Sequence, residues 1–243
     1  MAVARNQPRL PKASDILADQ LRAEILRNHL KSGDDLPSEA ELIALHQFSR
    51  STVREALRLL ESDGLITIQR GSKGGIKVAR PDMTQVSRIL AITFTFDEVT
   101  LGQFLAFRQL IEGEVAALAA ENATPEQRKT LLEISLEETE KRELGRAVEF
   151  HGYLGECTNN GVFKVIIGAI HEVVNMQTAL ERLTAVDTEA IKRAHRKIAQ
   201  AINAGKGNEA KRAMISHLAR YEEILEEHGR LNDAVVPPST WSF

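Results

Sequence analysis

The stretch SRSTVREALRLLESDGLITIQ, residues 49–69, decides the fold of the first third of this chain of 243 residues. Ser49 is a residue type that caps helix N-termini, and Gly64 favours a helix end. The residues between them repeat at the i, i+3, i+4, i+7 spacing of an amphipathic helix, with apolar side chains at Val53, Ala56, Leu57 and Leu60. Residues 65–69 then form a short β-branched run, which predicts a strand.

The flanking segments complete a small module. Upstream, apolar residues recur every fourth position over residues 14–30, with Ser14 placed to cap that helix, and residues 38–41 form a capping box after Pro37. Downstream, a glycine-rich turn over residues 71–75 separates two short strand-like runs. Residues 12–80 therefore predict three helices and a β-hairpin, the arrangement of a winged helix-turn-helix.

The rest of the chain shows helical periodicity throughout. We expect seven helices, near residues 84–93, 99–121, 125–141, 144–157, 161–183, 188–204 and 207–228. The predicted fold class is thus mainly α, with the winged module followed by an all-α bundle. The predicted domain boundaries are a flexible arm (1–11), the winged module (12–80), a linker (81–98), the bundle (99–229) and a flexible tail (230–243).

Charge is divided unevenly between these parts. The whole chain carries a net charge of −3, but the first 80 residues have three more basic than acidic side chains. That asymmetry indicates a nucleic-acid-binding module joined to an acidic domain. No apolar run is long enough to span a bilayer, and the N-terminus lacks the apolar core of a secretory signal. The single cysteine, Cys157, excludes an internal disulfide and fits a reducing compartment, so we expect a cytoplasmic protein.

Arginines on the third helix are candidate DNA contacts. Arg50, Arg54 and Arg58 follow one another at i+4 spacing on its polar face. Arginine can bind guanine or phosphate through paired donors, and the hydroxyls of Ser49 and Thr52 at the helix start suit phosphate. Basic residues also lie at the hairpin tip, namely Arg70 and Lys73. The alternative interpretation is that these charges form an ordinary solvated surface.

Three histidines of the helical half are candidate metal ligands. His195 and His217 lie 11 residues before and after Lys206, so an antiparallel helical hairpin places them at the same level. His151 lies on another helix, beside Phe150. Three imidazoles that converge inside a bundle can bind a divalent ion, although hydrogen-bonded core histidines remain an alternative. The other histidines, His29, His46, His171 and His228, are interpreted as ordinary residues.

The N-terminal motifs resemble the DNA-binding domain of GntR-type bacterial repressors. The resemblance rests on LPSE (36–39), SRSTVREAL (49–57), residues 60–66 and the wing-like GSKGGIKV (71–78). In the FadR branch the matching residues contact DNA, which implies DNA-binding roles for Ser49, Arg50, Arg54, Arg70 and Gly71. That branch has a further arginine where this chain has Ala40, so the resemblance implies a different operator sequence.

The helical half resembles the ligand-binding domain of the FadR subfamily. The matching residues are RQLIE (108–112), Ala119-Ala120, Phe150-His151 and the series His195, Ala210, Met214, His217, Leu218. Metal-binding members hold zinc or a similar ion with three histidines and an aspartate, which implies His151, His195 and His217 here. Ala147 occupies the aspartate position, and Glu149 is wrongly placed on the helix to replace it. Two alternatives follow: water or an effector carboxylate completes the site, or the metal has been lost. Arg108 matches an arginine that can bind an acidic effector, and an ion pair with Glu112 is the alternative.

These observations predict a ligand-responsive DNA-binding transcription regulator rather than an enzyme. We expect a repressor that binds a palindromic operator as a homodimer, because one reader covers only a half-site. A small carboxylate effector would bind in the helical domain with a divalent metal. The alternative function is a three-histidine metalloenzyme with an accessory DNA-binding module. It leaves the first 80 residues unexplained, and no further acid or base has motif-level placement.

Overall fold

The computed structural model describes residues 10–69, 75–137, 143–176 and 185–241. The chain divides into two compact units, residues 1–85 and residues 86–243. The first contains the predicted winged helix-turn-helix and the second the predicted helical bundle, so the expected fold class is confirmed.

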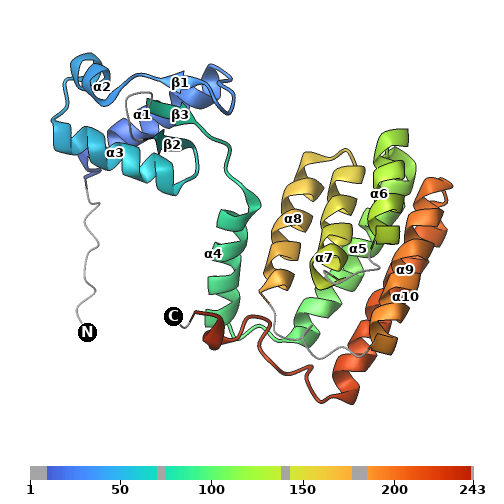
Figure 1. Ribbon diagram of the computed structural model, residues 1–243. Helices are drawn as coiled ribbons and strands as arrows, with labels where there is room; N and C mark the ends of the chain where they lie inside the picture. Colours follow the sequence, from blue (N-terminus) through green and yellow to red (C-terminus); the bar gives the residue numbers. More distant parts are fainter. Residues whose placement is uncertain (1–9, 70–74, 138–142, 177–184, 242–243) are drawn as a thin grey trace, which may run out of the picture. The chain divides into compact units, whose positions relative to one another are not determined.

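The first unit contains three helices and a small antiparallel sheet (Figure 1). Its elements are α1 (Ala13–Arg27), β1 (Asp35–Leu36), α2 (Glu39–His46), α3 (Arg50–Ser62), β2 (Ile66–Gln69) and β3 (Gly75–Val78). β3 lies between β1 and β2, and Ile76 is opposite both Leu36 and Ile68. The hairpin was predicted, whereas β1 is a third strand of two residues, too short to produce a periodic pattern.

The core of this unit joins α1 to α3. Leu17 and Leu21 of α1 and Val53 and Leu60 of α3 are almost completely buried. The predicted cap at Ser14 is wrong, because α1 already begins at Ala13 and Ser14 is buried within its first turn. The side chain of Asp15 accepts a hydrogen bond from the backbone N–H of Lys12 instead, at 3.3 Å.

The second unit is helical in the described ranges. Its helices are α4 (Met83–Phe96, which begins before the unit boundary), α5 (Leu101–Asn122), α6 (Pro125–Glu137), α7 (Glu143–Cys157), α8 (Gly161–Asn175), α9 (Ala185–Asn203) and α10 (Gly207–Glu227). α5 packs along α10, α7 along α8, and α9 contacts both α6 and α10 (Figure 1). None of the helices in these ranges combines the length and apolar character that crossing a membrane requires.

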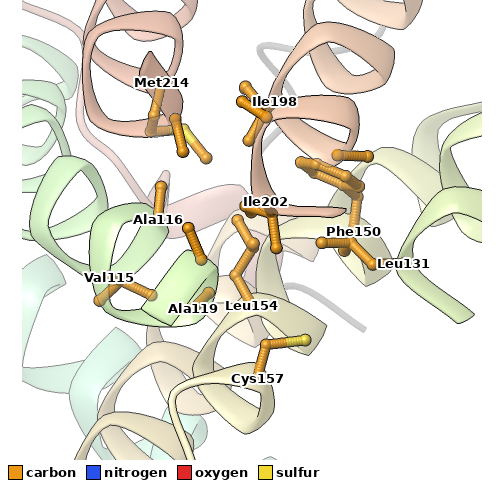
Figure 2. Packing of buried hydrophobic residues seen from close by; sticks show 14 of the residues in the cluster. Val115, Ala116, Ala119, Leu131, Phe150, Leu154, Cys157, Ile198, Ile202 and Met214 are labelled. Carbon is orange, nitrogen blue, oxygen red and sulfur yellow. The ribbon is translucent and has the colours of Figure 1, made fainter. Parts of the chain in front are cut away.

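The bundle core contains residues from α5, α6, α7, α8, α9 and α10. Figure 2 shows Phe150, Ile198 and Ile202 gathered there, and all three are fully buried.

Close packing of α5 on α10 depends on a glycine. A Cβ at Gly113 would lie 2.9 Å from Ile215 Cγ1, a distance that real Cβ atoms essentially never show. Glycine at this position therefore permits the approach of the two helices that carry Arg108 and His217.

The C-terminal segment packs against the start of α5 and differs from the flexible tail that Pro237-Pro238 suggested. Val235 and Val236 are fully buried. The backbone N–H of Val235 donates to the carbonyl of Val99 at 2.8 Å, and Trp241 Nε1 donates to Thr95 Oγ1 at 3.3 Å. Two buried valines and these hydrogen bonds hold the segment on the bundle, which a local sequence pattern does not reveal.

Candidate functional site

Hydroxyl groups cluster at the N-terminus of α3. Ser49 is its N-cap and accepts a hydrogen bond from the backbone N–H of Thr52 at 3.2 Å. The Ser49 hydroxyl also lies 2.8 Å from that of Thr52 and 2.9 Å from that of Ser51. The predicted cap is confirmed. Three hydroxyls, two exposed and that of Thr52 half-buried, therefore meet at a helix N-terminus, which is a favourable place for a phosphate.

The polar face of α3 presents arginines to solvent. The side chains of Arg50, Arg54 and Arg58 are 78%, 62% and 71% exposed. Arg58 pairs with Glu55 within the helix at 3.5 Å. Arg50 and Arg54 both pair with Glu39 at the first position of α2. The sequence analysis did not identify Glu39 as a partner, because the helix-turn-helix fold brings α2 to these arginines.

The hairpin is tied to the end of α3 by Glu61, whose Oε1 accepts a hydrogen bond from the backbone N–H of Ile68 at 3.2 Å. β2 is an edge strand, so this contact satisfies a donor that no neighbouring strand can bind. The predicted wing residues Arg70 and Gly71 lie outside the described residues.

In the second unit, three histidines converge from three helices. His151 of α7, His195 of α9 and His217 of α10 are all buried. The Nε2 atom of His195 lies 3.1 Å from the Nε2 atoms of both His151 and His217. The remaining Nε2–Nε2 distance, between His151 and His217, is 3.3 Å. The predicted trio is thus brought together as the spacing around Lys206 suggested.

The geometry of the trio fits a metal ion. A tetrahedral zinc ion with bonds of about 2.0–2.1 Å to nitrogen places neighbouring ligand atoms roughly 3.3–3.4 Å apart. The observed separations of 3.1–3.3 Å are close to this value. Three protein ligands also leave a coordination position for water or for another ligand. His151, His195 and His217 are therefore able to bind one divalent ion.

A buried carboxylate orients one of these histidines. Glu112 Oε2 accepts a hydrogen bond from His151 Nδ1 at 2.6 Å. The other oxygen, Oε1, lies 3.1 Å from His171 Nε2 and 2.6 Å from Arg108 Nε. Sequence reasoning missed Glu112 and His171 as parts of this site. The Arg108–Glu112 ion pair is the alternative that the sequence left open for Arg108.

Burial sets the charges in this cluster. It lowers the pKa of His151 and of His171 to about 4 and that of His195 to about 3. Burial alone would raise the pKa of Glu112. The charge of Arg108 and the interactions of the carboxylate with His171 and His151 outweigh burial, so the pKa of Glu112 lies well below its usual range. At neutral pH the carboxylate is therefore ionised and these imidazoles are neutral, the form in which histidine binds a metal.

Neutral His171 donates its Nε2–H to Glu112, which leaves its Nδ1 atom as an acceptor. That atom is buried and has no hydrogen-bond partner among the described residues, and the same is true of the Tyr221 hydroxyl. Tyr221 follows His217 by one helical turn on α10. Unpaired buried polar atoms are costly, so both atoms are candidate hydrogen-bond partners for a bound polar ligand or water.

A cavity of about 260 Å³ lies between α9 and α10 and reaches His217 and Tyr221. Charged side chains from both helices line it: Asp187, Arg193 and Lys197 come from α9, and Arg220, which pairs with Glu223 and Glu227, comes from α10. Glu149 is exposed and does not join the histidines, as its helical position predicted. The side chain of Ala147 lies outside the described residues.

Comparison with known proteins agrees with both units. Residues 13–78 match the model of the bacterial regulatory proteins of the gntR family, and residues 103–220 match the FCD domain. The HTH-type transcriptional regulator LutR of Bacillus subtilis is 30% identical over 83% of this chain and 95% of its own length. The HTH-type transcriptional repressor NanR of Cronobacter sakazakii is 32% identical over 89% of this chain and 88% of its own length.

A solved structure, Streptococcus agalactiae GntR, shares the fold with a TM-score of 0.63 at 24% identity, and it covers 86% of this chain and 99% of its own. The matched families are regulators, so the metalloenzyme alternative is not supported. The chain belongs to the gntR family of bacterial regulatory proteins and is a DNA-binding transcription regulator with a C-terminal FCD domain.

Proposed function

We propose that this regulator represses transcription as a homodimer on a palindromic operator and is released by a small organic acid bound at a metal in the FCD domain. The convergence of the His151, His195 and His217 Nε2 atoms within 3.1–3.3 Å carries the metal and effector part of this proposal. The repressor NanR among its relatives supports the sign of regulation. Such a protein would act on chromosomal DNA in the cytoplasm.

Operator recognition is assigned to the exposed start of α3. Arg50 and Arg54 would contact base edges in the major groove, and the hydroxyls of Ser49 and Thr52 would bind phosphate. Arg70 and Gly71 are proposed wing contacts on the strength of the family resemblance. Two copies are required because one α3 covers a single half-site, and a two-fold dimer matches a palindrome.

The effector is proposed to be a carboxylate. When bound, a divalent ion supplies a positive centre with an open position for one carboxylate oxygen. Arg108 lies near this centre through its contact with Glu112, and it would take part in binding the acid. The cavity of about 260 Å³ between α9 and α10 would hold only a small molecule, and its three basic lining residues outnumber the acidic Asp187, which would favour entry of an anion.

Binding of the effector would shift the equilibrium between DNA-bound and free conformations of the dimer. The free energy of this shift cannot exceed the difference between the effector's binding free energies for the two conformations. A thermal-shift screen of small organic acids, with and without zinc, tests this directly. We expect hits only with zinc present, and each hit should release the protein from its operator. Hits that are independent of zinc would contradict the metal-centred effector site.

The DNA contacts are tested by Arg54→Ala, with Arg27→Ala as the matched control. Arg27 is exposed in the last turn of α1, so both variants remove one positive charge from the same unit. We expect Arg54→Ala to abolish operator binding at physiological salt while the protein stays folded and dimeric. Equal affinities of the two variants would contradict the assignment of α3 as the reading helix.

A further inference from the structure

Glu39 is the acidic partner of both proposed reading arginines. Its Oε1 atom lies 3.1 Å from Arg50 Nε, and its Oε2 atom lies 3.7 Å from Arg54 Nε. One carboxylate therefore spans two guanidinium groups that are one helical turn apart on α3. Glu39 is one-third exposed, so it lies at the same solvent-facing surface as the two arginines.

Stability does not explain this arrangement. Ion pairs between exposed side chains contribute little to stability, and the two arginines are 78% and 62% exposed. The consequence that remains is orientation. A long, flexible arginine whose guanidinium is held samples fewer rotamers, so less conformational entropy is lost when it binds DNA.

The atoms in contact decide which donors stay available. Glu39 engages the Nε side of each guanidinium. Within the described residues, no other acid pairs with the terminal nitrogens of Arg50 or Arg54. Those paired nitrogens are able to bind guanine O6 and N7 together, the commonest specific arginine contact in the major groove.

The charge of Glu39 acts in a second way. Binding to DNA of unrelated sequence depends mainly on neutralising phosphates, and it weakens when negative charge lies at the interface. A carboxylate between two arginines lowers the net positive charge of the reading surface. Such a repulsive group penalises loose complexes in which the arginines contact only phosphates.

We propose that Glu39 is a positioning residue for operator recognition, which holds Arg50 and Arg54 by their Nε atoms for base contact and disfavours binding to unrelated DNA. This inference rests on the proposed reading role of α3. It goes beyond that role by assigning part of the sequence preference to an acidic residue of α2.

The test compares affinities for two duplexes, one selected from a random library by the wild-type protein and one with the same composition in scrambled order. Glu39→Gln keeps the side-chain shape and removes the charge. Glu39→Asp keeps the charge and shortens the side chain. Glu24→Gln is the control, because Glu24 is exposed on α1 and its substitution also removes one negative charge from the first unit.

We expect the ratio of selected to scrambled affinity to fall roughly tenfold in Glu39→Gln, with tighter binding to the scrambled duplex. Glu39→Asp should lower the ratio without tightening that binding, and Glu24→Gln should keep the wild-type ratio. The inference would be overturned if Glu39→Gln and Glu24→Gln had the same ratio of affinities. It would also be overturned if Glu39→Gln bound both duplexes more tightly by the same factor, because Glu39 would then only mask the arginines. A wild-type protein without sequence preference would overturn the proposed α3 reading role as well.

Discussion

A hydrogen bond of 2.6 Å between Glu112 Oε2 and His151 Nδ1 determines which ring nitrogen of His151 faces His195 and His217. An ionised carboxylate only accepts hydrogen bonds, so Nδ1 carries the proton and Nε2 presents its lone pair to the other two histidines. Carboxylate–histidine pairs of this kind orient metal ligands and raise their basicity.

Glu112→Gln should therefore weaken zinc binding by about 10–100-fold, because an amide can also donate and no longer fixes the tautomer. Competition against a chromophoric chelator measures this affinity. Glu114→Gln is the control, since Glu114 lies on the same helix but is exposed and pairs with Lys211. If both variants bind zinc as tightly as the wild type, Glu112 serves packing alone.

Metal removal should lower thermal stability. We expect about one divalent ion per chain after purification, and a ligand at 100 times its Kd adds about 2.7 kcal/mol to the free energy of unfolding. A chelator should remove both the ion and this increment. His195→Ala should lack both from the start, whereas His46→Ala, which changes α2 of the first unit, should retain them. Elemental analysis and thermal denaturation give the two readouts. Protein that stays metal-free after purification with zinc would favour hydrogen-bonded core histidines.

The sequence indicated most of the winged module and only part of the histidine cluster. Ser38, Ser49 and the apolar stripe of α3 are local signals, because a capping residue and an amphipathic repeat act within a few residues of one another. His195 and His217 could be placed together because only a short turn separates their helices. Placing residues together in this way works only for helices that follow one another directly in the sequence.

Glu112 and His171 were missed because their contact spans 59 residues and joins α5 to α8, with two helices between them in the sequence. A signal for His171 exists, since it lies four residues after Ile167 and three before Val174 on a buried face of α8. That helix is apolar on most sides, however, so its periodicity does not distinguish an inward histidine. The packing of α5, α7 and α8 decides the cluster, and no local pattern encodes it.

Arg108→Ala should destabilise the metal-free protein strongly. Arg108 and Glu112 form a buried ion pair, and removing one partner leaves a buried charge, which typically costs about 3–5 kcal/mol. Urea denaturation measures the loss, with the exposed Arg212→Ala as the control on α10. The double variant Arg108→Ala/Glu112→Gln should recover part of the stability. A loss of under 1 kcal/mol for Arg108→Ala would show that solvent reaches the pair.

Cys157 should be unreactive in the folded protein. Its side chain is fully buried in the bundle core beside Leu154 (Figure 2), and burial raises the pKa of the thiol to about 12. The thiolate is the nucleophile, so alkylation by iodoacetamide at pH 8 should occur only after denaturation in guanidinium. Because the folded pKa is raised, stability should fall as pH increases from about 9 towards 12, where the unfolded chain ionises first. Rapid labelling of the folded protein would contradict this burial.

Val236→Ala tests the packing of the C-terminal segment. Val236 is fully buried, and its carbonyl accepts a hydrogen bond from Thr95 Oγ1 at 3.3 Å, the same hydroxyl that accepts one from Trp241 Nε1. A cavity at this position should lower the free energy of unfolding by about 1–3 kcal/mol. Trp241 is the single tryptophan of the chain, so its fluorescence reports the segment directly. We expect a red-shifted emission in Val236→Ala and none in Val186→Ala, whose valine is 75% exposed. Unchanged emission and stability would mean that the segment leaves the bundle readily in solution.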